Sequence, residues 1–130
     1  MKEVQEFLKE CGNYFLATCD GDKPKVRPFG TIEIFEDHLY IQTGKNKDVS
    51  KQIKKNPNVE ICGFNGTRWI RVSGSLIRDD RIEAKQDMLD KNPALKKMYL
   101  AEDDNTEVLY FEKGVATFYS FTEAPTTIEF

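Results

Sequence analysis

The chain has 130 residues, a net charge of −3 at pH 7 and a pI near 5.3. This length is enough for one domain with its own apolar core, without support from disulfides or metal. The acidic balance disfavours nucleic acid as a partner, and no apolar run approaches the length that crosses a bilayer. We therefore expect a single cytoplasmic domain over residues 1–130, without an export leader and without a nucleic-acid or membrane partner.

The first half of the chain predicts a helix followed by strands. Apolar side chains at helical spacing over residues 4–11 indicate an amphipathic helix that ends at Gly12. Strands are expected next at residues 14–19, 26–35 and 39–43, followed by a short helix at 47–55. Pro28 removes a ladder donor from the second strand, so we expect that strand at a sheet edge or distorted.

The second half predicts mostly strands. Two strands, 59–64 and 68–77, are joined by an Asn-Gly pair, which is a strong hairpin signal. Asp79-Asp80 is expected to cap a helix that runs to Asn92, and a second short helix follows. Closing strands are predicted at 108–111 and 115–121, with the remaining residues forming a loose tail or an arm toward a partner subunit. Six or seven strands with short helices between them indicate a mainly-β α+β fold, an antiparallel barrel or curled sheet.

Few side chains suit catalysis by the protein itself. His38 is the only histidine and lies in an acidic turn, so neither a Ser/His/Asp set nor a metal site has its usual residues. The three cysteines are odd in number and lack C-x-x-C spacing, which indicates reduced thiols in the core. If the protein is an enzyme, we expect it to borrow its reactive group from a cofactor.

Positive charge gathers in one part of this acidic chain. Residues 23–55 contain eight Lys or Arg against four Asp or Glu. Such a group favours a small anion with several oxygens, such as a phosphate monoester. Arg27 is the leading candidate because its planar fork suits adjacent phosphate oxygens; the alternative is a solvated or ion-paired strand arginine. Thr43 at a strand end, with Lys47 and Lys51 at a helix start, would add a hydroxyl and further charge, or would be ordinary strand and surface residues.

Trp69 and Arg71 share one face of their predicted strand, while Ile70 and Val72 share the other. The second pair suits a barrel interior, which leaves Trp69 and Arg71 outside. A large aromatic side chain beside an arginine indicates an interface or a ligand wall. Gly74 on the same strand either lets another backbone approach or bends the strand.

The order of these motifs resembles the pyridoxamine 5′-phosphate oxidase-like, FMN-binding split-barrel family. The resemblance covers residues 14–77 and rests on these blocks: Phe15-Leu16-Ala17-Thr18, Asp20-Gly21, Pro24-Lys25-Val26-Arg27-Pro28-Phe29-Gly30, Tyr40-Ile41-Gln42-Thr43, Asn56-Pro57 and Trp69-Ile70-Arg71-Val72-Ser73-Gly74. It implies a six-stranded antiparallel split β-barrel that is usually a homodimer, with FMN in the groove between subunits. The C-terminal tryptophan and arginine of the true oxidases have no counterpart here, so oxidation of pyridoxamine 5′-phosphate is not the expected reaction.

The resemblance also implies which residues would bind FMN. Arg27, Thr43 and Lys47 would hold the phosphate, with Lys51 nearby. The backbone of Val26, Pro28 and Phe29 would edge the ring together with Gln42. Trp69 and Arg71 would border the flavin and the dimer seam.

We therefore expect an FMN-dependent oxidoreductase that passes electrons from a reduced nicotinamide to a small organic acceptor. Three alternatives stay open. The first is a non-catalytic flavin-binding or redox-sensing module. The second is a protein that holds a deazaflavin or heme in the same barrel. The third is a protein that binds single-stranded nucleic acid on its exposed aromatic face.

Overall fold

The computed structural model describes all 130 residues and contains nine strands, three α-helices and one 3₁₀ helix. The helices are α1 (Lys2–Cys11), α2 (Asp48–Lys55), α3 (Ile82–Lys91) and η1 (Pro93–Lys97). The strands are β1 (Tyr14–Asp20), β2 (Lys23–Phe29), β3 (Glu33–Phe35), β4 (His38–Gly44), β5 (Asn58–Phe64), β6 (Arg68–Asp79), β7 (Thr106–Phe111), β8 (Val115–Ser120) and β9 (Thr126–Glu129). The mainly-β prediction is confirmed, with more strands than the expected six.

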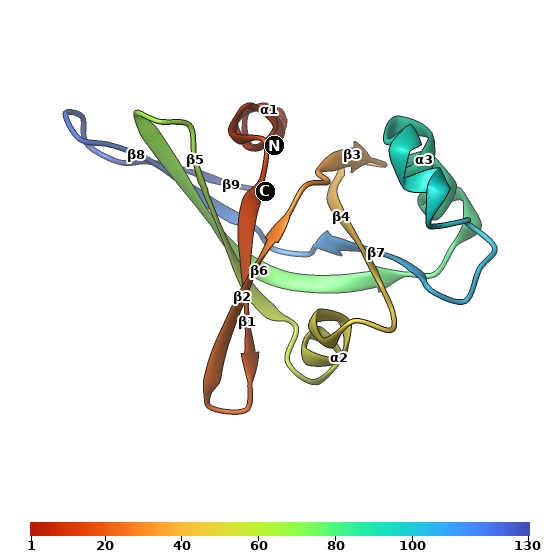
Figure 1. Cartoon of the computed structure of the whole chain (residues 1–130). Helices are drawn as coiled ribbons and strands as arrows, with labels where there is room; N and C mark the ends of the chain where they lie inside the picture. The colour runs from red at the N-terminus through yellow and green to blue at the C-terminus, as the bar shows by residue number, and fades with distance from the viewer.

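The sheet is antiparallel throughout and divides into two arms that share β6 (Figure 1). One arm has the order β2-β1-β5-β6-β8-β9, and the other has the order β6-β7-β4-β3. The first half of β6 pairs with β8, and its last four residues pair with β7. Gly74 lies where the pairing changes, and a Cβ there would be 2.9 Å from the backbone oxygen of Lys113. Of the two roles that the sequence left open for Gly74, close approach of another backbone is therefore the one observed.

The core lies between the inner faces of the two arms and is covered by helices. Ile70 and Val72 are fully buried there, together with Leu16 of β1 and Ile41 of β4. Helix α1 packs against β5 and β3, while α2 packs against β1 and β4 at the opposite end (Figure 1). No helix is both long enough and apolar enough to cross a membrane.

Strand β2 pairs only with β1, so it forms the sheet edge that Pro28 predicted. The expected single strand over 26–35 is wrong, because β2 ends at Phe29 and β3 begins at Glu33. Between them the chain leaves β1 and crosses toward β4, where the Thr31 hydroxyl accepts a hydrogen bond from the Gln42 backbone amide at 3.0 Å. This crossing connects the two arms.

Two other predictions need correction. The final residues are not loose: β9 pairs with β8, and Gly114 and Phe130 exchange backbone hydrogen bonds of 2.8 and 2.9 Å. Asp80 does not cap α3, which begins after Arg81 without a side-chain cap. Asp79 is instead buried, where it accepts hydrogen bonds from Tyr40 at 2.7 Å and from the Arg81 side chain at 2.9 and 3.0 Å.

Candidate functional site

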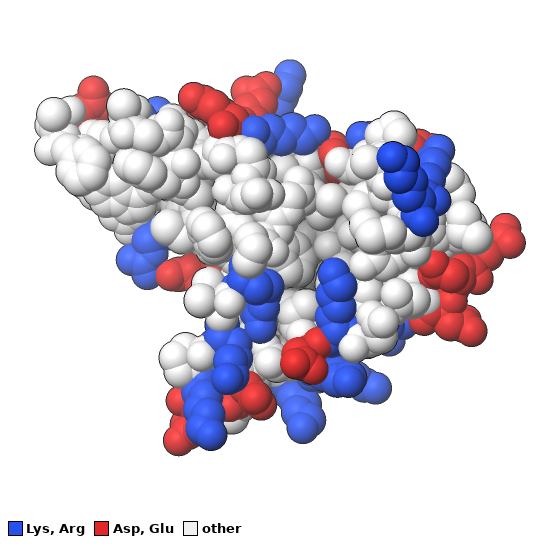
Figure 2. All heavy atoms as spheres, viewed as in Figure 1, with Lys and Arg blue, Asp and Glu red and all other residues white.

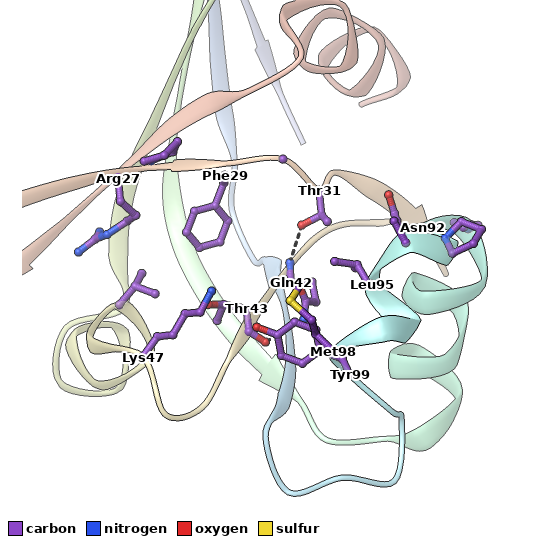
Figure 3. Close-up of a pocket in the computed structure, with 16 residues that line it drawn as sticks. Arg27, Phe29, Thr31, Gln42, Thr43, Lys47, Asn92, Leu95, Met98 and Tyr99 are labelled. Atoms are coloured by element: carbon purple, nitrogen blue, oxygen red, sulfur yellow. Dashed lines mark hydrogen bonds between the residues drawn. The ribbon is translucent and has the colours of Figure 1, made fainter.

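A cleft of about 550 Å³ opens where the two arms part, beside the portion of β4 that lies beyond its pairing with β3. The end of β2, the second half of β4 and the start of α2 form one side of it, and the α3–η1 connection forms the other (Figure 3). Its volume lies within the range of roughly 300–1,000 Å³ that small-molecule sites occupy. We call this space the first cleft. It has a basic end and an apolar end.

Arg27 forms the basic end, and its guanidinium is held by neutral acceptors only. It donates hydrogen bonds to the Thr18 hydroxyl at 2.7 Å, to the Gln52 side-chain oxygen at 2.6 Å and to the Leu16 backbone oxygen at 3.2 Å. A guanidinium has five N–H donors, so two remain for a ligand. Arg27 is half-buried and faces α2; it is not the fully solvated strand arginine that the sequence left open.

Thr18 and Gln52 are functional candidates that the sequence interpretation missed. The Thr18 hydroxyl donates to the Gln52 side-chain oxygen at 2.6 Å, so both residues fix the position of the Arg27 side chain. Gln52 lies at helical spacing with the buried Val49 and Ile53. A polar side chain on the buried face of a helix needs a partner, and that was the signal available in the sequence.

The charge at this end of the cleft is not neutralised by nearby carboxylates. Neither Arg27 nor Lys47 has a carboxylate oxygen within 4.0 Å of its side-chain nitrogens. Partial burial lowers the pKa of Arg27, and the more distant Asp48 opposes this shift. Lys and Arg side chains are concentrated over the β1–β2 hairpin and α2 on this face of the molecule (Figure 2). An anion placed here would therefore meet positive charge that the protein leaves largely uncompensated.

The start of α2 adds backbone donors beside Lys47, whose own side chain reaches toward the first cleft in Figure 3. Lys47 is the N-cap residue of α2, and no side chain caps the first turn. Free N–H groups at a helix start attract anions. Thr43 lies on β4 just before this turn and lines the same cleft. Arg27, Thr43 and Lys47, three of the residues predicted to hold a phosphate, therefore line the same cleft.

The apolar end of the first cleft comes from β2 and the α3–η1 region. Phe29 projects into the cleft from the end of β2, facing Leu95, Met98 and Tyr99 across the opening (Figure 3). Gln42 lies between them, and its side chain donates a hydrogen bond to the Thr43 backbone oxygen at 3.1 Å. The sequence predicted a short helix around Leu95 but gave no signal that it faces β2. A flat, largely apolar group therefore fits beside a bound anion.

A second cleft of about 770 Å³ continues from the first, between the β1–β2 hairpin and α2. Arg27 and Lys47 line both clefts and so mark their junction. Val26 and Lys51, both predicted site residues, line only the second cleft. Of the ten predicted residues, the six that line the first cleft are Arg27, Pro28, Phe29, Gln42, Thr43 and Lys47.

Trp69 and Arg71 line neither cleft. Trp69 stacks on Tyr119 with ring centroids 5.3 Å apart and an interplanar angle of 7°. Arg71 pairs with Glu60 at 2.7 Å. Both lie on the outer face of the first arm, as their alternation with Ile70 and Val72 predicted.

The fold is that of the split-barrel proteins related to pyridoxamine 5′-phosphate oxidase. A NimC/NimA family protein from Clostridium acetobutylicum is 46% identical, with a TM-score of 0.97 over 100% of this chain and 92% of that one. General Stress Protein 26 from Bacillus anthracis is 21% identical, with a TM-score of 0.73 over 98% of this chain and 97% of that one.

A pyridoxamine 5′-phosphate oxidase-related, FMN-binding protein from Nostoc punctiforme has the same fold at 14% identity, with a TM-score of 0.60 over 99% of this chain and 95% of that one. The family profile described as "Pyridoxamine 5′-phosphate oxidase" matches residues 1–108, and no curated protein matches the chain. The chain belongs to the pyridoxamine 5′-phosphate oxidase family.

Proposed function

We propose that the first cleft binds FMN and that the protein is an FMN-dependent oxidoreductase. The observation that carries this proposal is Arg27, which is held by neutral acceptors and keeps two free N–H donors at one end of a cleft whose other end contains Phe29, Leu95 and Met98. FMN has the matching shape, because a phosphate dianion lies at one end and a flat ring system at the other. Membership of the family and the fold shared with the FMN-binding protein from Nostoc punctiforme also support this cofactor.

In this proposal each residue has one task in binding. Arg27 and Lys47 hold the phosphate, together with the Thr43 hydroxyl and the N–H groups at the start of α2. Phe29, Leu95 and Met98 shield the ring from water, and Gln42 borders it. When bound, the flavin accepts electrons from a donor and passes them to an acceptor. The proposed donor is a reduced nicotinamide and the proposed acceptor is a small organic molecule.

We also propose that the protein acts as a cytoplasmic homodimer. The exposed aromatic face of the first arm supports this state, because Phe15, Phe64 and Phe121 are 51%, 53% and 78% exposed. Phe64 lies opposite Trp69, Trp69 lies opposite Tyr119, and the Phe121 ring lies 5.0 Å from the Trp69 ring, so these four rings form one surface. An apolar patch of this kind indicates a protein interface. Phe64→Asp should convert the dimer to a monomer in sedimentation velocity, and an unchanged sedimentation coefficient would contradict this interface.

The test of function begins with the absorbance of protein mixed with FMN and passed over a desalting column. We expect retention of a yellow complex and anaerobic bleaching by reduced nicotinamide, with recovery after a nitroaromatic acceptor is added. Loss of all FMN on the column, with no thermal stabilisation by FMN, would reject the cofactor. A yellow complex that reduced nicotinamide does not bleach would favour the alternative of a non-catalytic flavin-binding or redox-sensing module.

A further inference from the structure

The second cleft is more basic than binding of a monophosphate requires. Five basic side chains line it, against the two carboxylates of Asp20 and Asp48; the five are Lys25, Arg27, Lys47, Lys51 and Lys55. None of the five has a carboxylate oxygen within 4.0 Å, and neither aspartate pairs with any other cation. Five cations against two carboxylates leave a surplus of three positive charges in this cleft, and none of its cations forms a direct ion pair.

The position of this charge relative to the first cleft determines which part of a bound ligand it can contact. Arg27 and Lys47 belong to both clefts, so a phosphate held by them lies at the junction. Lys25 and Lys55 line only the second cleft, on the far side of that junction from Phe29 and Leu95. A group attached to the phosphate would leave the first cleft through this junction. The next charged group along such a ligand would then meet Lys25 and Lys55.

We propose that the second cleft receives a further phosphoryl group and the nucleoside attached to it, so that the protein binds a flavin dinucleotide such as FAD. This inference rests on the proposed binding of a flavin in the first cleft. The first phosphate remains at Arg27 and Lys47, and the second phosphate is held by Lys25 and Lys55. The cavity of about 770 Å³ is of a size that nucleotide-sized ligands occupy. The adenosine end lies between the hairpin and α2.

The experiment compares the affinities of riboflavin, FMN and FAD for the full chain by quenching of flavin fluorescence. The unaltered protein should bind FAD at least as tightly as FMN, and both more tightly than riboflavin. The double variant Lys25→Ala/Lys55→Ala should weaken FAD binding about tenfold and leave FMN binding within about twofold, because two solvent-exposed charge contacts, each weaker than a contact to the half-buried Arg27, are lost only from the dinucleotide. Both side chains are exposed, so the melting temperature should stay unchanged.

Lys54→Ala is the matched control, because Lys54 is a neighbouring lysine on α2 that does not line the second cleft. It should leave binding of all three flavins unchanged. FAD binding that is weaker than FMN binding, or an equal loss of FMN and FAD in the double variant, would overturn the inference and leave the proposed function intact. Failure of all three flavins to bind would instead overturn the proposed function itself.

Discussion

Replacing Arg27 with alanine should weaken FMN binding by removing contacts to its phosphate. Three of the five guanidinium donors are used inside the protein, which leaves two for phosphate oxygens. Hydrogen bonds between charged groups contribute about 1.5–3 kcal/mol, and each 1.4 kcal/mol is a factor of ten in affinity. Loss of one such contact should raise the Kd for FMN about 10- to 150-fold, and loss of both should raise it further.

Fluorescence titration with FMN and with riboflavin separates this effect from a general loss of the cleft. Riboflavin lacks the phosphate, so its affinity should be the same for Arg27→Ala and for the unaltered protein. Arg27→Lys keeps the charge without the planar fork and should give an intermediate Kd. Arg68→Ala, which removes an arginine that lines neither cleft, is the matched control and should bind FMN normally. An unchanged Kd for FMN, or an equal loss of riboflavin binding, would refute the reasoning.

Three further predictions concern the support of this site and of the fold. Gln52→Glu places a carboxylate against the Arg27 guanidinium, so FMN binding should weaken about tenfold in the same titration while riboflavin binding is unchanged; tighter FMN binding would contradict this. Gly74→Ala should lower the free energy of unfolding by about 1–3 kcal/mol in urea titrations, because its Cβ meets backbone at 2.9 Å; equal stability would contradict this. Hydrogen bonds from Arg81 lower the pKa of Asp79 from 3.8 to about 2. The ionised Asp79 therefore stabilises the fold by about 1–2 kcal/mol above pH 4, and this stabilisation is lost as the pH falls toward 2. Urea titrations of Asp79→Asn should match the unaltered protein near pH 2 and fall below it at pH 7, and a constant difference would contradict this.

The sequence predicted most elements of the fold because their signals are local. The Asn65-Gly66 turn and the alternation of Ile70 and Val72 with polar or exposed residues are visible within a few positions. The break after Phe29 was not visible, because alternation continues through residues 30–32 while the chain changes its pairing partner from β1 to β4. The last strand was missed for a related reason. Next to its pairing with β8, the Phe130 ring occupies the space that a side chain at position 114 would fill. Gly114 lies 16 positions earlier in the chain, so no local pattern indicates this contact.

The site shows the same division between local and long-range information. Arg27, Thr43 and Lys47 could be proposed from residue type and their positions at strand and helix ends. The partners that hold Arg27 could not, because Thr18 and Gln52 lie 9 and 25 positions away in sequence and meet it only through packing of α2 on β1. The apolar wall of η1 likewise reaches the first cleft through tertiary packing alone.

The most direct test of the account is a crystal structure of the protein grown with excess FMN. We predict that the FMN phosphate lies within hydrogen-bond distance of the Arg27 guanidinium and the Lys47 side chain, with the ring against Phe29. A structure in which FMN lies elsewhere, or in which the first cleft stays free of flavin while Arg27 keeps only its contacts to Thr18 and Gln52, would contradict the account.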